Sequence, residues 1–213
     1  MTFKLASRSL VFLALSSGLL LAQGPKVAHT VHTGPVVPAR ETPATTVTLF
    51  TNLGPSAADL YNDTTGYYVL GPSNSVGDSE QWIGLPFTAK VSAHVTVLQL
   101  AIGWISGTKG IDVGLYADDG TGNVGAVLAS GHSTKIPAFG TCCQLVSVTL
   151  PATAITAGSQ YWVVATSDDT HAPDFTGVFQ ASNSGTVAYN PAIAGWTAFS
   201  TNTPAAAVKG TVP

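Results

Sequence analysis

Apolar residues alternate with polar or small residues in many short runs of this chain, and this period of two limits the fold more than any other feature. In the run Val95–Ile105, every second residue from Leu98 to Trp104 is apolar. Successive side chains of a β-strand point to opposite faces, so the run predicts a strand with one buried face. The valines before Leu98 have the opposite parity, which predicts a β-bulge near Val97–Leu98.

Ten shorter runs have strand character, and Gly, Pro, Asn and Asp separate them as turn residues. No segment outside the first 24 residues repeats apolar residues with a helical period over three turns, and only a short turn is expected near Ser56–Leu60. The chain is therefore predicted to be all-β, a single antiparallel β-sandwich or jelly roll. The ten runs are Val47–Thr51, Gly66–Leu70, Gln81–Leu85, Ile111–Leu115, Gln144–Leu150, Tyr161–Ala165 (buried on both faces), Phe175–Phe179, Thr186–Tyr189, Trp196–Phe199 and Ala206–Val212.

Residues 1–24 have the pattern of a secretory signal peptide. Lys4 and Arg8 precede the apolar stretch Leu10–Leu21, which is shorter than the roughly 20 residues that span a bilayer. Residues 25–46 are rich in Pro and Thr and predict an extended linker. Residues 47–213 form the predicted β-sandwich domain. We expect a mature chain without a membrane span, in a secreted, extracellular or cell-envelope location.

The chain has few charges and is weakly acidic. Eight Lys and Arg residues oppose eleven Asp and Glu residues, and the leader contains two of the basic ones, Lys4 and Arg8. A surface without a basic cluster argues against nucleic acid and against anionic membranes as partners.

Calcium is the one cofactor for which the sequence offers a candidate site. Asp118, Asp119 and Asn123 lie with two glycines in a short loop between strand-like runs, and oxygen ligands on such a loop suit a hard cation. The spacing differs from that of an EF-hand, and a hairpin turn requires the same residue types, so both interpretations stay open. A second, weaker candidate comprises Asp168, Asp169 and Asp174.

Catalytic motifs are sparse, and no catalytic residue is predicted. The chain has no Gly-x-Ser-x-Gly elbow, and His132 is interpreted as a polar residue at a strand edge. Glycoside hydrolysis needs two carboxyl groups, one with a raised pKa. Glu80, the one glutamate outside the linker, lies close to Trp82 and could supply the acid. A solvated residue at a strand edge is the other interpretation of Glu80.

Exposed aromatic rings are candidates for carbohydrate binding, because a flat ring stacks on the face of a sugar. Trp196 lies in a loop-like segment, and Phe139 lies close to the cysteines. Tyr67 and Tyr68 are adjacent, so one of them should face outward. Packing inside the sandwich is the alternative for each ring, and it is the expected role of Trp82, Trp104 and Trp162.

The two cysteines, Cys142 and Cys143, are adjacent in the sequence. A bond between them encloses no loop and so removes almost no entropy from the unfolded chain. Three states are open: a vicinal disulfide, two free thiols, or a link to another chain. An oxidising compartment favours the disulfide. Because neighbouring side chains of a strand point to opposite faces, the disulfide requires a turn at Thr141–Cys143.

Six segments together form a recognisable pattern: Gly114–Gly120, Val124–Leu128, Pro137–Cys143, Ala157–Val164, Val187–Asn190 and Gly195–Thr197. They resemble bacterial exported β-sandwich proteins of the choice-of-anchor type, and the R-type domain in particular. The resemblance covers about Val47–Phe199 and implies an exported sandwich domain with no established activity. Domains of this family precede different C-terminal sorting signals. The sequence ends at Pro213 without such a signal, so we expect secretion or non-covalent association with the surface.

These observations predict an exported, non-enzymatic binding or adhesion module whose partner is an extracellular polysaccharide or a surface component. A carbohydrate-active enzyme with Glu80 as the acid, and a structural component of the envelope, are the alternatives. The candidate ligand-binding residues are Tyr68, Phe139, Cys142, Cys143 and Trp196.

Overall fold

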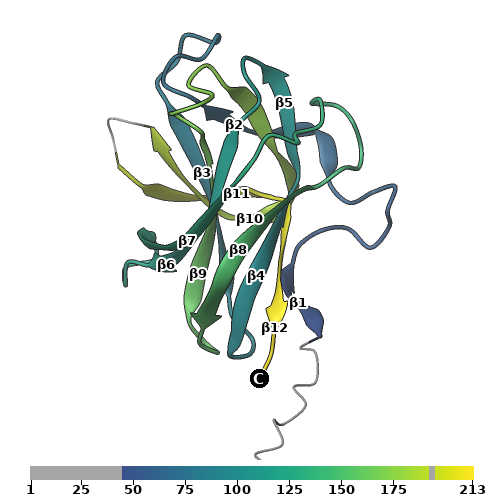
Figure 1. Ribbon diagram of the computed structural model, residues 1–213, viewed down its shortest axis with the longest axis vertical. Coiled ribbons are helices and arrows are strands. Elements are labelled where there is room, and N and C mark those ends of the chain that lie inside the picture. The colour runs from purple at the N-terminus through teal and green to yellow at the C-terminus, as the bar shows by residue number, and fades with distance from the viewer. Residues whose placement is uncertain (1–44, 192–194) are drawn as a thin grey trace, which may run out of the picture. The chain divides into compact units, whose positions relative to one another are not determined.

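Two packed β-sheets make up the described part of the chain (Figure 1). The computed structural model describes residues 45–191 and 195–213, which contain strands and turns but no helix, and so no helix that could cross a membrane. The predicted all-β sandwich is thereby confirmed. The leader and almost all of the linker lie outside the described residues, and both stay predictions.

The smaller sheet contains four antiparallel strands in the order β1 (Thr46–Thr51), β12 (Ala206–Thr211), β4 (Ala93–Leu100) and β8 (Val146–Ile155). The alternating residues of β4 and β8 are buried against the larger sheet, as their period of two predicts. The bulge expected near Val97–Leu98 lies one step earlier, between Val95 and Val97.

The larger sheet contains eight strands. Its main path is β11 (Thr197–Pro204), β10 (Thr176–Pro191), β2 (Asn62–Leu70), β3 (Gln81–Thr88), β9 (Gln160–Ser167), β6 (Ile111–Asp118) and β7 (Val124–Ser133), with β5 (Ile102–Ser106) paired to β10. Strand β9 lies between β3 and β6, and its residues Tyr161–Ala165 are all buried, as expected.

Four expected strands have different limits in the structure. The run Val95–Ile105 is two strands in different sheets, because the chain crosses from β4 to β5 at Ala101. The runs Phe175–Phe179 and Thr186–Tyr189 belong largely to one long strand, β10. Strand β8 begins at Val146 rather than Gln144, because the cysteine turn occupies the preceding residues.

The outer face of the larger sheet carries an apolar cluster of its own. On β9, Val163 and Ala165 belong to the core between the sheets, whereas Trp162 and Val164 point to the other face. There they pack with Val124 and Ala188, and Tyr116 and Trp196 partly cover them. This outer-face cluster supports the site described next.

Candidate functional site

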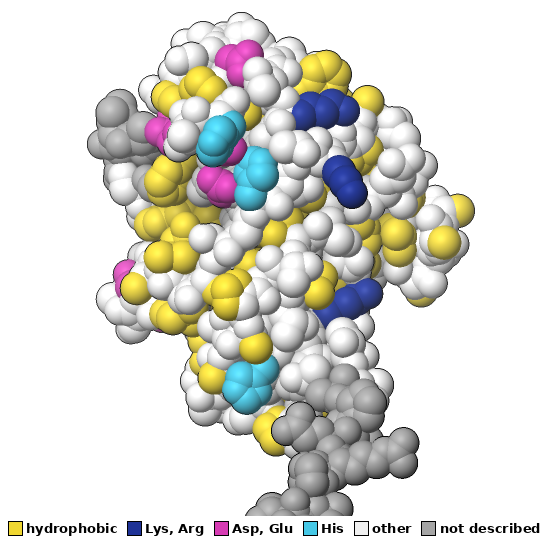
Figure 2. Space-filling view, viewed as in Figure 1, with side chains coloured by type: hydrophobic (Ala, Val, Ile, Leu, Met, Phe, Trp, Pro, Cys, Tyr) yellow, Lys and Arg dark blue, Asp and Glu magenta, His cyan; other side chains and the backbone are white. Residues whose placement is uncertain are grey.

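Acidic, histidine and tryptophan side chains meet on the outer face of the larger sheet, and we call this group the acid–histidine site. Figure 2 shows histidine and acidic side chains gathered together on the face in view, beside hydrophobic ones. Contacts between side chains define the members of the site, which are Glu80, Trp82, Asp112, His132, Asp168, Asp169, His171 and Trp196.

Strand register places the first members of the site in a row. Asp112 lies between two core residues of β6, so its side chain points outward. It is paired with His132 of β7 on one side and with Thr166 of β9 on the other. On β3, Trp82 precedes Ile83, which is paired with Ala165, the residue before Thr166 on β9. Four adjacent strands therefore contribute one outward side chain each to the row.

Asp168 links the two histidines. It is only 4% exposed, and its Oδ2 lies 2.8 Å from Nδ1 of His171 and 3.3 Å from Nδ1 of His132. The same nitrogen of His132 lies 3.1 Å from Oδ1 of Asp112. Backbone N–H groups of Thr170 and His171 donate to Oδ1 of Asp168 at 3.2 and 3.0 Å. Because both rings direct Nδ1 to carboxylates, Nε2 of each ring is the nitrogen available to a ligand.

The environment moves the pKa values of the two aspartates in opposite directions. Burial disfavours ionised Asp168, but hydrogen bonds from the backbone and ring of His171, and the charges of His171 and His132, outweigh it and lower the pKa. For Asp112, burial raises the pKa, the hydrogen bond from His132 opposes the rise, and the negative charge of Asp168 adds to it.

Replacing Asp168 with asparagine should lower the free energy of unfolding at pH 7 by about 1.5–3 kcal/mol, because charged hydrogen bonds are lost. A lowered folded pKa means that Asp168 stabilises the fold above its unfolded pKa of about 3.9 and loses this effect as pH falls through the folded value. Urea denaturation at pH 7 and pH 3 measures the difference, which should shrink in acid. Asp112→Asn is the matched control and should cause no such loss at pH 7, since the pKa of Asp112 is raised. Equal losses for Asp168→Asn at both pH values would contradict this role.

Glu80 forms the second part of the site. Trp82 donates its indole N–H to the Glu80 carboxyl group at 2.5 Å, and the carboxyl group of Asp169 interacts with that of Glu80 closely enough to raise its pKa. The hydroxyl of Ser167 donates to Asp169. Burial raises the pKa of Glu80, the bond from Trp82 opposes the rise, and Asp169 reinforces it. The ring of Trp196 lies 6.4 Å from that of Trp82.

A hollow of about 630 Å³ opens at the histidines. Its volume is within the range of small-molecule sites, about 300–1,000 Å³. Neither Lys nor Arg is among its lining side chains, all of which can form hydrogen bonds: Asp112, His132, Thr134, Asp168, Thr170 and His171.

The structure separates the ligand-binding residues expected from the sequence. Trp196 lies against Trp82 in the acid–histidine site. Tyr68 is 46% and Phe139 is 37% exposed, and both lie on the outer face around β5 and β10. Tyr68 is opposite Val178, which is opposite Gly103, and the backbone of Phe139 covers Gly103. Trp196 and Cys143 belong to different apolar clusters.

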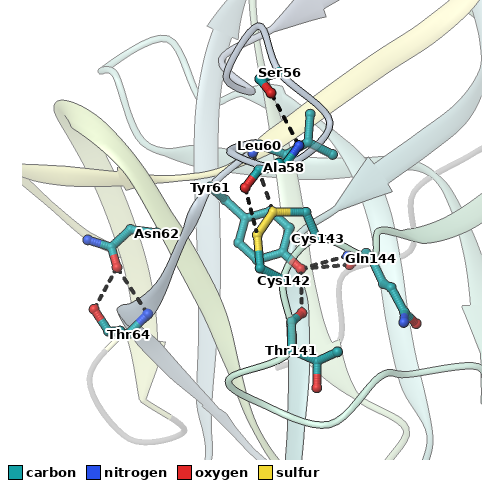
Figure 3. The surroundings of a disulfide bond; sticks show 10 residues. All are labelled: Ser56, Ala58, Leu60, Tyr61, Asn62, Thr64, Thr141, Cys142, Cys143 and Gln144. Carbon is teal, nitrogen blue, oxygen red and sulfur yellow. Dashed lines mark hydrogen bonds between the residues drawn. A yellow bond between two sulfur atoms is a disulfide. The ribbon is translucent and has the colours of Figure 1, made fainter.

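Cys142 and Cys143 form a vicinal disulfide in a turn, which confirms the first of the three open states (Figure 3). Cys142 is exposed, and Cys143 is half-buried, where its Sγ accepts a hydrogen bond from the backbone N–H of Leu60. The Tyr61 hydroxyl accepts from the backbone N–H of Gln144 at 2.8 Å, and the carbonyl oxygens of Thr141 and Gln144 lie 3.0 and 3.1 Å from it. Burial raises the pKa of Tyr61, with a smaller opposing effect from Gln144. Tyr61 therefore holds both ends of the turn.

Replacing Tyr61 with phenylalanine should lower the free energy of unfolding by about 1–2 kcal/mol, because two hydrogen bonds to the turn are lost from a buried hydroxyl. Thermal and urea denaturation measure the loss. Tyr68→Phe is the control, since Tyr68 is exposed, and should have no effect. If both variants were equally stable, Tyr61 would not hold the turn.

The Asp118–Asn123 loop is a tight turn that uses its own carboxylates. Oδ2 of Asp118 accepts from Gln160 and from the indole of Trp162, and its Oδ1 accepts from Gly120. Hydrogen bonds from Thr121 lower the pKa of exposed Asp119. Within the described part of the chain, no three His, Cys, Asp or Glu side chains are arranged to hold a metal ion. The carboxylates of Asp118 and Asp119 thus accept hydrogen bonds from the backbone of their own turn.

The sequence patterns did not predict that the residues of the acid–histidine site lie together. They grouped Asp168 and Asp169 with Asp174, but Asp174 accepts a hydrogen bond from Thr108 instead. The sequence predicts only a polar residue at a strand edge for His132 and no role for His171, whereas both rings contact Asp168. The outward parity of Asp112 between two apolar residues was a usable signal. Its pairing with His132 of β7 depends on the strand register, which the sequence does not show.

Comparison with protein-family models and with curated proteins found no match to this chain.

Proposed function

We propose that this chain is an exported, non-enzymatic module that binds a saccharide at the acid–histidine site. One observation carries the proposal: a hollow of about 630 Å³ lined by hydrogen-bonding groups opens at Asp112, His132 and Asp168. The Trp82–Trp196 pair belongs to the same site through Glu80, whose carboxyl group binds Trp82 and interacts with Asp169, the residue after Asp168. A saccharide presents hydroxyl groups around a ring with apolar faces. Carboxylates and imidazoles can bind the hydroxyls, and an indole can stack on the ring.

The charge state of the site supports the same proposal. Glu80 and Asp112 have raised pKa values because burial opposes their ionisation. A buried carboxyl group with a raised pKa lowers the free energy of unfolding at neutral pH, where it must ionise. Carboxyl groups with shifted pKa values are concentrated at functional sites. The predicted leader and the resemblance to choice-of-anchor domains agree with an extracellular role.

A glycan array probed with the mature chain tests the proposal. We expect binding to a limited set of glycans, and loss of that binding in Trp82→Ala and Asp112→Asn. Tyr68→Ala and Phe139→Ala are matched controls, since both rings are exposed and neither lines the hollow. Binding that depends on Tyr68 or Phe139, but not on Trp82, would move the site to the other part of the surface. An array without any bound glycan would remove the support for saccharide recognition.

The raised pKa of Glu80, which an acid catalyst requires, supports one alternative, a glycoside hydrolase with Glu80 as the acid. Incubation of the mature chain with the glycans it binds, followed by detection of new reducing ends, distinguishes the two functions. A binding module releases none. Release that disappears in Glu80→Gln, with glycan binding retained, would establish the enzyme instead.

A further inference from the structure

The turn with the vicinal disulfide presents its two sulfur atoms to different surroundings. Cys142 is exposed, and its Sγ lies 3.7 Å from the carbonyl oxygen of Ala58. Cys143 is half-buried, and its Sγ accepts a hydrogen bond from the backbone N–H of Leu60 at 3.5 Å. Both contacts come from the loop that precedes β2 (Figure 3). The loop therefore offers an acceptor to one sulfur atom and a donor to the other.

This arrangement favours negative charge on one of the two sulfur atoms. A hydrogen bond to the charged form of a group stabilises that form, so the N–H of Leu60 stabilises a thiolate on Cys143. The carbonyl oxygen of Ala58 opposes a thiolate on Cys142, but it can accept a hydrogen bond from a thiol there. When the disulfide is opened, the surroundings thus fit a thiol at Cys142 and a thiolate at Cys143.

Contacts other than the disulfide hold this turn in place. The hydroxyl of Tyr61 binds Thr141 and Gln144, the residues on either side of the two cysteines. Before them in the chain, the N–H of Phe139 donates to the carbonyl oxygen of Trp104 on β5 at 2.8 Å. The disulfide itself encloses no loop, so opening it changes the entropy of the unfolded chain very little. We expect the fold and the turn to persist when the bond is opened.

We propose that Cys142–Cys143 is a reversible thiol–disulfide exchange site for small external thiols, in which Cys142 is attacked and Cys143 is the leaving group. Attack requires access to a sulfur atom, which exposed Cys142 provides. Departure of the other sulfur is faster when its thiolate is stabilised, which the N–H of Leu60 provides. The turn shares no residue with the acid–histidine site, so the inference does not depend on saccharide binding there.

The exchange with a small dithiol takes place in two steps. First, one thiolate of the dithiol forms a bond to Sγ of Cys142 as the bond between the cysteines breaks, and the electron pair leaves with Sγ of Cys143. Second, the other thiolate attacks the reagent's own sulfur in the mixed disulfide, and the electron pair leaves with Sγ of Cys142. The dithiol becomes a cyclic disulfide and loses two electrons, which the cysteines gain. Its two protons pass through water to the cysteine sulfurs.

Reaction of the mature, folded chain with an excess of 2-mercaptoethanol, a monothiol, tests the direction of attack. Acid stops the exchange at successive times, pepsin digests the chain without leaving acid, and tandem mass spectrometry locates the adduct on either cysteine. We expect about tenfold more adduct on Cys142 than on Cys143 at the earliest times. Equal labelling, a preference for Cys143, or reaction only after unfolding in urea would overturn the proposal.

Reduction with dithiothreitol tests whether the site opens without unfolding the chain. Intact mass should show the gain of two hydrogens. Thermal denaturation followed by circular dichroism should give a midpoint within about 4 °C of that of the oxidised chain. A much larger fall would show that the disulfide is a structural staple, and it would overturn the proposal.

Re-formation of the disulfide in the reduced chain tests the role of the turn. With oxidised dithiothreitol as the electron acceptor, Tyr61→Phe should close the bond about 3- to 10-fold more slowly than the wild type, because its turn is held less firmly. Tyr68→Phe is the matched control and should close at the wild-type rate, since Tyr68 lies on β2 opposite Val178. Equal rates for both variants would overturn the inference that the turn is held ready for closure.

Discussion

Replacing Trp162 with alanine will lower the free energy of unfolding by about 3–5 kcal/mol, the usual loss for a fully buried tryptophan. Trp162 is 0% exposed although it points to the outer face of the larger sheet. Its ring packs with Val164 and Ala188, and its indole N–H donates to Asp118 at 3.2 Å. The alanine variant leaves a cavity and removes a donor from this carboxylate. Urea denaturation followed by circular dichroism measures the loss.

Trp162→Phe is the matched control for this prediction. Phenylalanine cannot donate to Asp118, but it fills most of the space. Trp162→Phe should therefore lower the free energy of unfolding clearly less than Trp162→Ala does. If Trp162→Ala lost less than about 1 kcal/mol, the outer-face cluster would not be a second core. The acid–histidine site would then lack the rigid support that the structure gives it.

Replacing Glu80 with glutamine will raise the free energy of unfolding at neutral pH by about 1 kcal/mol while it abolishes glycan binding. Burial and the neighbouring Asp169 raise the pKa of Glu80. Glutamine keeps an oxygen that can accept from Trp82, and its amide can donate to Asp169. Gain of stability with loss of binding is the result expected where a fold keeps an unfavourable charge for function.

The raised pKa of Glu80 also predicts how the stability difference between Glu80→Gln and the wild type changes with pH. A raised folded pKa means that Glu80 favours the folded state below its unfolded pKa of about 4.3, and that this effect disappears as pH rises through the folded value. The advantage of Glu80→Gln should therefore grow from acid to neutral pH. Asp78→Asn, at an exposed neighbouring residue, is the control and should change neither stability nor binding. A Glu80→Gln variant that is less stable at pH 7 would contradict the account.

Local patterns in the sequence were sufficient to predict the fold class and several burial states. The uniformly apolar run Tyr161–Ala165 predicts a strand covered on both faces, which is what the outer-face cluster provides. Adjacent Tyr67 and Tyr68 predict one outward ring, and Tyr68 is that ring. The adjacent cysteines require a turn if they are bonded, and the structure has one. Each of these inferences depends on side chains within a few residues of one another.

Contacts between distant strands were beyond the sequence patterns. Alternation cannot show that Val95–Ile105 crosses between sheets at Ala101, because both halves keep the same period. The pairing of Asp112 with His132 depends on the register of β6 and β7, which shifts twice along the pair. Asp168 reaches His132 only through the loop after β9. The acid–histidine site is therefore a product of register and loop position, which no short motif encodes.

Titration calorimetry of the mature chain, with the glycan that it binds most strongly on the array, tests saccharide recognition by the acid–histidine site most directly. We expect one site per chain, at least a tenfold loss of affinity in Trp82→Ala, and unchanged affinity in Tyr68→Ala. Equal affinities for the wild type and Trp82→Ala, with both proteins folded, would contradict the proposal.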